Sequence, residues 1–202
     1  MFFASIIVLA AAFVAVQVHR RTNWTWFLSR SSPALKPGSY VLITGCDSGF
    51  GRQTAIRLAS QGFLVLAGCL QEENARSLAT VSSNIDAFVC DVTIEKDREA
   101  CMARVERLGK GKLCAVVNNA GISDGYIAEW TDLSVYRRVM DINFFAAVAF
   151  TQACLPHLRA TKGRVVNLSS AAGFFPNYGM AAYTASKHAI AGTRDVARLV
   201  AV

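Results

Sequence analysis

The chain has little of what marks disordered, fibrous or low-complexity proteins. Only four of its 202 residues are proline, and charged side chains make up 17% of it. It also has no internal repeat, whereas hydrophobic residues reach 53%. This balance excludes a disordered tail and a collagen-like chain, and it predicts one globular domain with an ample core.

The six cysteines lack the spacing of a metal centre. They form no CxxC pair and no ligand-like group with the three histidines, and such groups are what structural zinc sites need. Most of the six lie in apolar runs, where a free thiol behaves as a small hydrophobic side chain. We therefore expect reduced core cysteines in a domain that faces the cytosol, and no metal.

Acidic side chains are absent from residues 1–46, which hold four basic ones. The rest of the chain then has 21 − 4 = 17 basic and 14 acidic residues, a net charge of +3 out of the total of +7. A nucleic-acid-binding protein would concentrate its positive charge on the folded part. The charge pattern thus excludes a nucleic-acid partner and places the basic excess beside an apolar segment.

That apolar segment, residues 1–18, carries no charged side chain. As a helix it would span about 27 Å, close to the roughly 30 Å hydrocarbon core of a bilayer. Basic residues follow the run rather than precede it, which favours an uncleaved anchor over a signal peptide and keeps the remaining chain in the cytosol. We predict a transmembrane anchor over 1–18, a basic and aromatic juxtamembrane linker over 19–38, and a globular domain over 39–202.

Within 39–202, short apolar runs alternate with helix-length segments. The expected strands are 40–44, 63–69, 86–90, 113–118 and 164–168. The expected helices are 51–61, 72–81, 94–108, 132–160 (kinked or ended by Pro156) and 182–202. Apolar strands separated by helices predict an α/β fold with a doubly wound, Rossmann-type parallel sheet. Ligands of such sheets bind beyond the C-terminal ends of the strands.

A glycine-rich turn lies between the first expected strand and the first expected helix. Residues 44–51 read TGCDSGFG, a GxxxGxG spacing that departs from the common GxGxxG dinucleotide fingerprint. Glycines allow a pyrophosphate to approach the backbone, and a helix N-terminus supplies oriented amides and a positive dipole end. Tight turns need glycine in any case, so this motif alone is weak evidence.

Three further features follow along the chain. NNAG closes the fourth expected strand at residues 118–121, Ser170 closes the fifth, and Tyr183 and Lys187 share one helix face four positions apart. Each has an ordinary explanation when taken singly, such as a surface pair or a serine that caps the next segment. Found in this order and register, they point to one site.

Together these motifs resemble the short-chain dehydrogenase/reductase family, which has TGxxxGxG, NNAG, and a serine thirteen positions before the tyrosine of YxxxK. The resemblance covers residues 39 to about 194. The motif TGCDSGFGR, together with an apolar N-terminal run, resembles the sequences of the membrane-bound retinol and hydroxysteroid dehydrogenases. This implies an endoplasmic reticulum membrane protein with a cytosolic domain that acts on a hydrophobic alcohol, ketone or aldehyde of retinoid or steroid type.

The resemblance also implies residue roles. Tyr183 would be the general acid/base, Ser170 would orient the substrate oxygen, Lys187 would hold the nicotinamide ribose, and Asn143 would position a proton-relay water. A phenol ordinarily ionises near pH 10, and an ammonium about 4 Å away favours its anion. The implied cofactor contacts are Thr44, Gly45, Asp47, Ser48, Gly49, Phe50, Gly51, Asp91, Val92, Asn118, Asn119, Ala120 and Gly121, together with Tyr183 and Lys187.

The charges near the turn favour NAD over NADP. Ser48 stands before Gly49 where a basic residue would bind a 2′-phosphate, and residues 70–72 contain no basic side chain either. Asp47 and Glu72 add negative potential instead. The carboxylate that usually follows the second strand is missing.

In this family the helix bearing Tyr183 and Lys187 is followed by further strands and a substrate-binding segment, so we expect a C-terminally incomplete domain. Two hypotheses stay open. One is an oxidoreductase that transfers a hydride between a nicotinamide cofactor and the hydrophobic substrate. The other is a truncated, catalytically impaired nucleotide-binding isoform with an interaction role. The helices 132–160 and 182–202 resemble the family's dimer-forming pair, which implies a homodimer.

Overall fold

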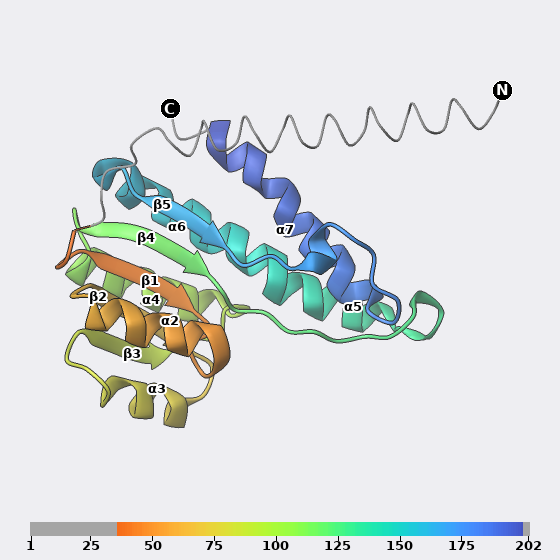
Figure 1. Ribbon diagram of the computed structural model, residues 1–202, viewed down its shortest axis with the longest axis horizontal. Coiled ribbons are helices and arrows are strands. Elements are labelled where there is room, and N and C mark those ends of the chain that lie inside the picture. Colours follow the sequence, from red (N-terminus) through yellow and green to blue (C-terminus); the bar gives the residue numbers. More distant parts are fainter. Residues whose placement is uncertain (1–35, 200–202) are drawn as a thin grey trace. The chain divides into compact units, whose positions relative to one another are not determined.

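The computed structural model describes residues 36–199, so the predicted anchor over 1–18 and most of the linker over 19–38 lie outside the described residues. Five parallel strands form one sheet in the order β3-β2-β1-β4-β5 (Figure 1). The strands are β1 (Tyr40–Thr44), β2 (Leu64–Cys69), β3 (Ile85–Val89), β4 (Leu113–Asn118) and β5 (Arg164–Asn167). The predicted parallel α/β sheet is confirmed.

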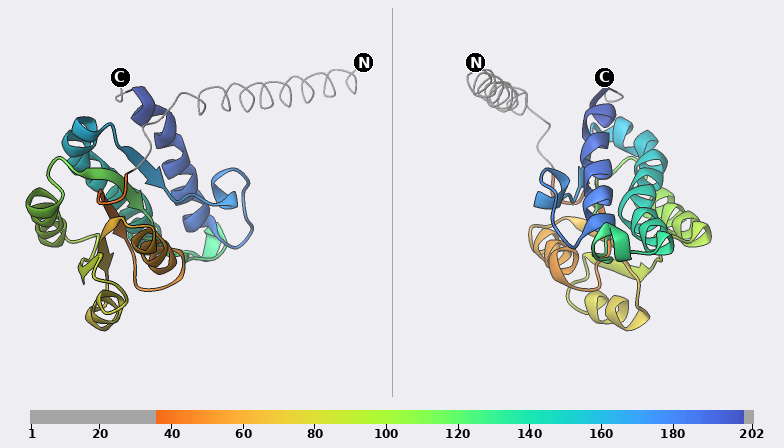
Figure 2. Two further views of the ribbon diagram at one scale, coloured as in Figure 1. Left: turned by 60° about the vertical axis from the view of Figure 1, so that its left-hand side comes forward. Right: turned by 90° about the vertical axis from the view of Figure 1, so that its right-hand side faces the viewer.

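Helices cover both faces of the sheet, which explains why the central strands are apolar throughout. The helices α2 (Gly49–Ser60) and α3 (Glu72–Ala79) lie on one face, and α4 (Glu95–Leu108) and α6 (Ala146–Thr161) lie on the other (Figures 1 and 2). The alternating side chains of β1 divide the core accordingly. Val41 and Ile43 pack in the cluster beneath α2 and α3, and Leu42 packs in the cluster beneath α4 and α6.

The segment expected as one helix over 132–160 is interrupted. It consists of α5 (Leu133–Met140), a π-helical turn η2 (Asp141–Phe145) and α6. In η2 the N–H of Ala146 donates to the carbonyl of Asp141, five residues back. Such bulges occur often at functional sites, and this one contains Asn143.

Of the two predicted effects of Pro156, ending the helix is wrong, because α6 continues beyond it to Thr161. A proline inside a helix removes the bond to the carbonyl four residues back, which belongs here to Gln152. Both residues are exposed, so water can reach that carbonyl.

The chain completes its described part with α7 (Ala181–Leu199) and two short 3₁₀ turns, η1 (Ala128–Trp130) and η3 (Ala171–Gly173). The helix α7 packs against α5, η2 and η3. Among the described residues, the continuous helical stretch Leu133–Thr161 is long and apolar enough to cross a membrane by length and composition. Its inner side packs against β4, as a core helix does.

All six cysteines lie in the described part, and each is buried with a free thiol. Burial raises the pKa of the Cys69 and Cys154 thiols to about 12, so both are protonated at neutral pH. The expectation that the cysteines lie in the core is confirmed.

Candidate active site

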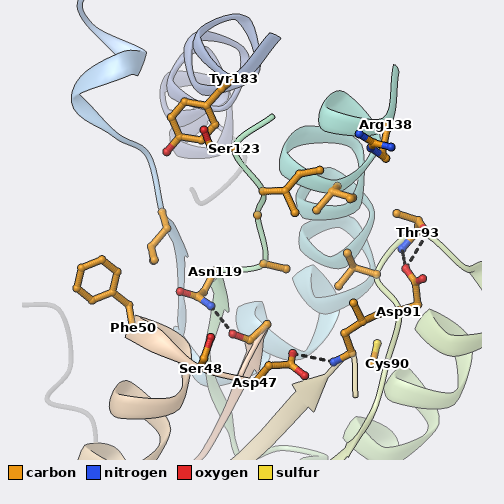
Figure 3. A pocket seen from close by; sticks show the side chains of 18 of the residues that line it. Asp47, Ser48, Phe50, Cys90, Asp91, Thr93, Asn119, Ser123, Arg138 and Tyr183 are labelled. Atoms are coloured by element: carbon orange, nitrogen blue, oxygen red, sulfur yellow. Dashed lines mark hydrogen bonds between the residues drawn. The ribbon is translucent and has the colours of Figure 1, made fainter. Parts of the chain in front are cut away.

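A cavity of about 790 Å³ opens at the C-terminal ends of the strands (Figure 3). Its volume falls in the range of small-molecule and cofactor sites, and segments after all five strands line it. The lining residues are Gly45, Asp47, Ser48, Phe50, Leu70, Gln71, Cys90, Asp91, Val92, Thr93, Asn119, Ala120, Gly121, Ile122, Ser123, Arg138, Ile142, Leu168, Ser169, Tyr183 and Lys187.

The turn between β1 and α2 needs glycine at two positions. Gly45 has a φ of +69°, and a Cβ there would lie 2.7 Å from the Cα of Ala120. A Cβ on Gly51 would collide with the carbonyl of Gly45 and the amide of Asn119. The glycines therefore bring this turn against the end of β4, and a side chain at either position would push the two apart.

The N-terminus of α2 opens onto this cavity. Gly49 has a φ of +54° and would carry its Cβ into open space. Within the described structure the side chain of Ser48 does not cap α2, and the first turn of the helix holds no acidic residue. The first amides and the positive dipole end are thus available to an anion.

Three of the predicted cofactor residues, Thr44, Asn118 and Asn119, form hydrogen bonds beneath this turn. The hydroxyl of Thr44 accepts from the backbone N–H groups of Asn119 and Ala120 at 3.2 and 3.1 Å, and the side-chain amide of Asn119 donates to the carbonyls of Thr44 and Gly45 at 2.8 Å each. The amide of Asn118 donates to Thr151 and Asn167 at 3.0 and 2.7 Å. Thr44 and Asn118 are buried and position the cavity wall without being part of it.

Asp47 connects the first turn to the end of β2. Its carboxylate accepts from the N–H groups of Leu70 and Gln71 at 2.8 Å each and from the side-chain amide of Asn74 at 3.1 Å. These donors lie at the N-terminal end of α3. Asp47 therefore places a negative charge where that helix would otherwise offer free amides.

The segment after β3 lies at the end of the cavity away from Tyr183 (Figure 3). The carboxylate of Asp91 accepts from the N–H and the hydroxyl of Thr93 at 2.9 and 2.7 Å, and its own N–H donates to Asp97 at 2.9 Å. Val92 is buried in the core cluster beneath α4 and α6. This turn presents a fixed, partly apolar surface to the cavity.

Tyr183 and Lys187 come from the first two turns of α7 and face the cavity together. The Nζ of Lys187 lies 5.5 Å from the centroid of the Tyr183 ring and donates to the carbonyl of Leu168 at 2.9 Å. Lys187 is 6% exposed, and burial lowers the pKa of its ammonium. The predicted pairing of these two side chains on one helix face is present in the structure.

Asn143 sits in η2, where it joins three elements. Its Oδ1 accepts from the N–H of Ile122 at 2.8 Å, and its Nδ2 donates to the carbonyl of Ile122 and to the hydroxyl of Ser186 at 2.9 Å each. A Cβ on Gly121 would lie 3.2 Å from Oδ1 of Asn143 and 3.6 Å from Nζ of Lys187. Asn143 and Lys187 therefore both border Gly121, and the amide of Asn143 is bonded to the segment after β4 and to α7.

The structure separates two adjacent serines. Ser169 lines the cavity with Tyr183 and Lys187, and its hydroxyl lies 3.5 Å from the carbonyl of Lys187. The predicted Ser170 is not among the lining residues. Its hydroxyl accepts from the N–H of Ala172 at 3.2 Å and caps η3.

Sequence reasoning missed several lining residues. Cys90 and Thr93 flank the predicted pair Asp91 and Val92, so adjacency alone could have indicated them. Arg138 had no local signal. It reaches the cavity from α5 because the helix passes over the ends of the strands.

Comparisons with known proteins agree with this architecture. Residues 39–201 match the family described as short chain dehydrogenase. The chain is 38% identical over 177 residues to bovine 17-beta-hydroxysteroid dehydrogenase type 6, covering 86% of this chain and 55% of that protein. It is also 38% identical over 167 residues to bovine mitochondrial D-beta-hydroxybutyrate dehydrogenase, covering 78% and 48%. The chain thus spans about half the length of these two relatives.

A solved structure of a short-chain dehydrogenase from Streptomyces avermitilis superposes with a TM-score of 0.75 at 29% identity, over 80% of this chain and 60% of that one. On the match over 39–201 and on this likeness, the chain belongs to the short-chain dehydrogenase family.

Proposed function

We propose that this chain carries the cofactor site and the catalytic side chains of an oxidoreductase that transfers a hydride between NAD and a hydrophobic alcohol or carbonyl compound. One observation carries the proposal. A lysine and a tyrosine face each other at one end of a cavity whose middle is a glycine-rich helix N-terminus.

The residues present fit a dinucleotide. Gly45 and Gly51 let the turn pack against the end of β4, and the free amides at the start of α2 suit a pyrophosphate. The turn at Asp91 and Val92 would hold the adenine, and Tyr183 and Lys187 would hold the nicotinamide ribose at the other end. The cavity joins these positions without interruption.

When bound, the nicotinamide supplies the hydride chemistry. Tyr183 would take the proton from the substrate hydroxyl during oxidation and return it during reduction. Lys187 would favour the anionic form of the phenol through its charge. Asn143 would hold Gly121 and Ile122 in place beside Lys187, with the proposed relay water near it. The serine that orients the substrate oxygen is Ser170 by motif spacing, and Ser169 lies nearer the cavity.

The preference for NAD is supported by Asp47. Its carboxylate already accepts from Leu70, Gln71 and Asn74, so a 2′-phosphate at this point would meet a fixed negative charge. The described lining offers no arginine or lysine beside Asp47 to offset that repulsion.

The substrate class follows from the relatives. One relative is named for a hydroxysteroid and another for D-beta-hydroxybutyrate, so an apolar and a small polar alcohol are the two alternatives. We favour the steroid or retinoid type because of the TGCDSGFGR motif and the apolar run over 1–18. An endoplasmic reticulum membrane anchor, a cytosolic catalytic domain and a homodimer through helices 132–160 and 182–202 belong to the same proposal.

The second candidate is a nucleotide-binding chain with impaired catalysis and an interaction role. It is favoured by one observation, namely that Ser170, the predicted orienting serine, caps η3 and does not line the cavity.

The test combines binding with turnover. NADH binding to the chain is titrated by fluorescence, and NAD⁺ reduction is followed at 340 nm with a 17β-hydroxysteroid, retinol or D-β-hydroxybutyrate. The proposal predicts NADH binding and turnover of the steroid or retinol. Binding without turnover of any alcohol supports the second candidate, and no binding contradicts both.

A further inference from the structure

The cavity has a basic residue at the end where the proposed adenine site lies. Arg138 projects from α5, one helical turn before Ile142, and both residues line the cavity. Figure 3 shows Arg138 on the side of Asp91 and Thr93, with Tyr183 on the other side. Among the described lining residues, Arg138 and Lys187 are the only basic ones, and Lys187 belongs to the catalytic end.

Asp124 holds Arg138 in place. The guanidinium forms an ion pair with the carboxylate of Asp124, which also accepts from the N–H of Gly125 at 2.7 Å. These interactions lower the pKa of Asp124, with the Gly125 bond as the first cause and Arg138 as the second. The pair joins α5 to the segment after β4. Its members are 57% and 41% exposed, so the guanidinium stays at the mouth of the cavity.

We propose that Arg138 caps the adenine ring of the bound dinucleotide by stacking its guanidinium plane on it. This inference rests on the proposed function. Val92, next to Asp91, and Ile142, one helical turn after Arg138, add apolar surface to the cavity lining. Arginine stacks on aromatic faces even when a carboxylate shares its charge, because the planar group is weakly hydrated.

A role in binding the pyrophosphate is less consistent with this placement. The amides at the start of α2 already suit that group. In addition, Asp124 offsets the charge of Arg138, which reduces its attraction for phosphate while leaving its flat face free.

The test separates the halves of the cofactor. Dissociation constants are measured for NADH, for ADP-ribose, which lacks the nicotinamide, and for reduced nicotinamide mononucleotide, which lacks the adenine. Arg138→Ala is expected to weaken NADH and ADP-ribose by about tenfold and to leave the mononucleotide unchanged. Arg138→Lys keeps the charge without the planar group, so it should restore less than half of the binding free energy for NADH and ADP-ribose that Arg138→Ala loses.

The matched control is Arg137→Ala, which removes the same charge from an exposed neighbour on α5 that does not line the cavity. It should leave all three constants unchanged. Equal weakening of the mononucleotide, unchanged ADP-ribose binding, or full recovery by Arg138→Lys would overturn the inference. A wild-type chain that binds neither NADH nor ADP-ribose would instead overturn the proposed function.

Discussion

At the scale of single residues, we expect the charge of Asp47 to decide which dinucleotide binds. Its carboxylate is fixed by three donors at the start of α3. A fixed charge repels a second anion more strongly than a mobile one, because it cannot move away or become better solvated. The discrimination between NAD and NADP should therefore depend on this single group.

Asp47→Asn should raise the affinity for NADPH relative to NADH by about tenfold, since it removes the charge with little change in size. Fluorescence titration with both reduced cofactors measures the ratio. Glu99→Gln is the control, because Glu99 is exposed on α4 and does not line the cavity. An unchanged ratio in Asp47→Asn, or an equal change in Glu99→Gln, would contradict this role.

Ser169 and Ser170 offer a second test at the scale of single residues. Motif spacing assigns the catalytic hydroxyl to Ser170, whereas the structure has Ser170 capping η3 and Ser169 lining the cavity. We predict that Ser170→Ala lowers kcat at least a hundredfold with unchanged NADH binding, and that Ser169→Ala lowers it less. The opposite order in steady-state kinetics would assign the role to Ser169.

The sequence allowed Tyr183 and Lys187 to be placed together because both lie on one helix, where a spacing of four fixes the geometry. Arg138 could not be placed in the same way. Its position in the cavity depends on where α5 lies relative to the ends of the strands, a long-range arrangement that no local spacing records. The hydrogen bonds of Asp47 to Leu70 and Gln71 were equally unpredictable from local spacing, because they depend on the pairing of β1 with β2.

At the scale of elements, the turn between β1 and α2 depends on close packing as well as on backbone conformation. Gly45 and Gly111 have nearly the same positive φ, +69° and +67°. Around Gly111, however, a Cβ would meet nothing within 4 Å. An alanine at Gly111 therefore measures the free-energy cost of the left-handed conformation alone, and an alanine at Gly45 adds the cost of the steric contact.

Gly111→Ala should cost about 1–2 kcal/mol of unfolding free energy, the ordinary cost of a left-handed alanine. Gly45→Ala should cost clearly more and abolish NADH binding, because its Cβ would press on the backbone of Ala120. Urea denaturation of both variants measures the difference. Equal losses of unfolding free energy in the two variants, or unchanged NADH binding by Gly45→Ala, would contradict this account of the turn.

Most elements were predictable because their apolar runs and turn residues agree locally. The helix over 132–160 was not predicted correctly in detail. The π-helical turn at Asp141–Phe145 follows from the bonds of Asn143 to Ile122 and Ser186, and these partners are distant in sequence. Periodicity also cannot reveal that Pro156 and Gln152 lie on the exposed side of α6.

At the scale of the whole molecule, the sheet order follows from strands that alternate with helices and cross over with one hand. This topology brings the ends of β1, β3 and β4 to one edge, so motifs 74 residues apart, such as Gly45 and Asn119, come into contact. The proposed activity depends on this convergence. It requires that one cavity hold a nucleotide at the turn and a reacting alcohol at Tyr183.

Tyr183→Phe tests that claim most directly, since it removes one hydroxyl and leaves the ring that faces Lys187. Single-turnover formation of NADH is followed at 340 nm with the chain in excess over NAD⁺ and with the 17β-hydroxysteroid or retinol as the alcohol. NADH binding is measured separately by fluorescence titration. Tyr178→Phe, at a tyrosine that is 92% exposed, serves as the control and should behave as wild type. The account predicts no NADH formation by Tyr183→Phe and a dissociation constant for NADH within about twofold of wild type. Hydride transfer at the wild-type rate by this variant would contradict it.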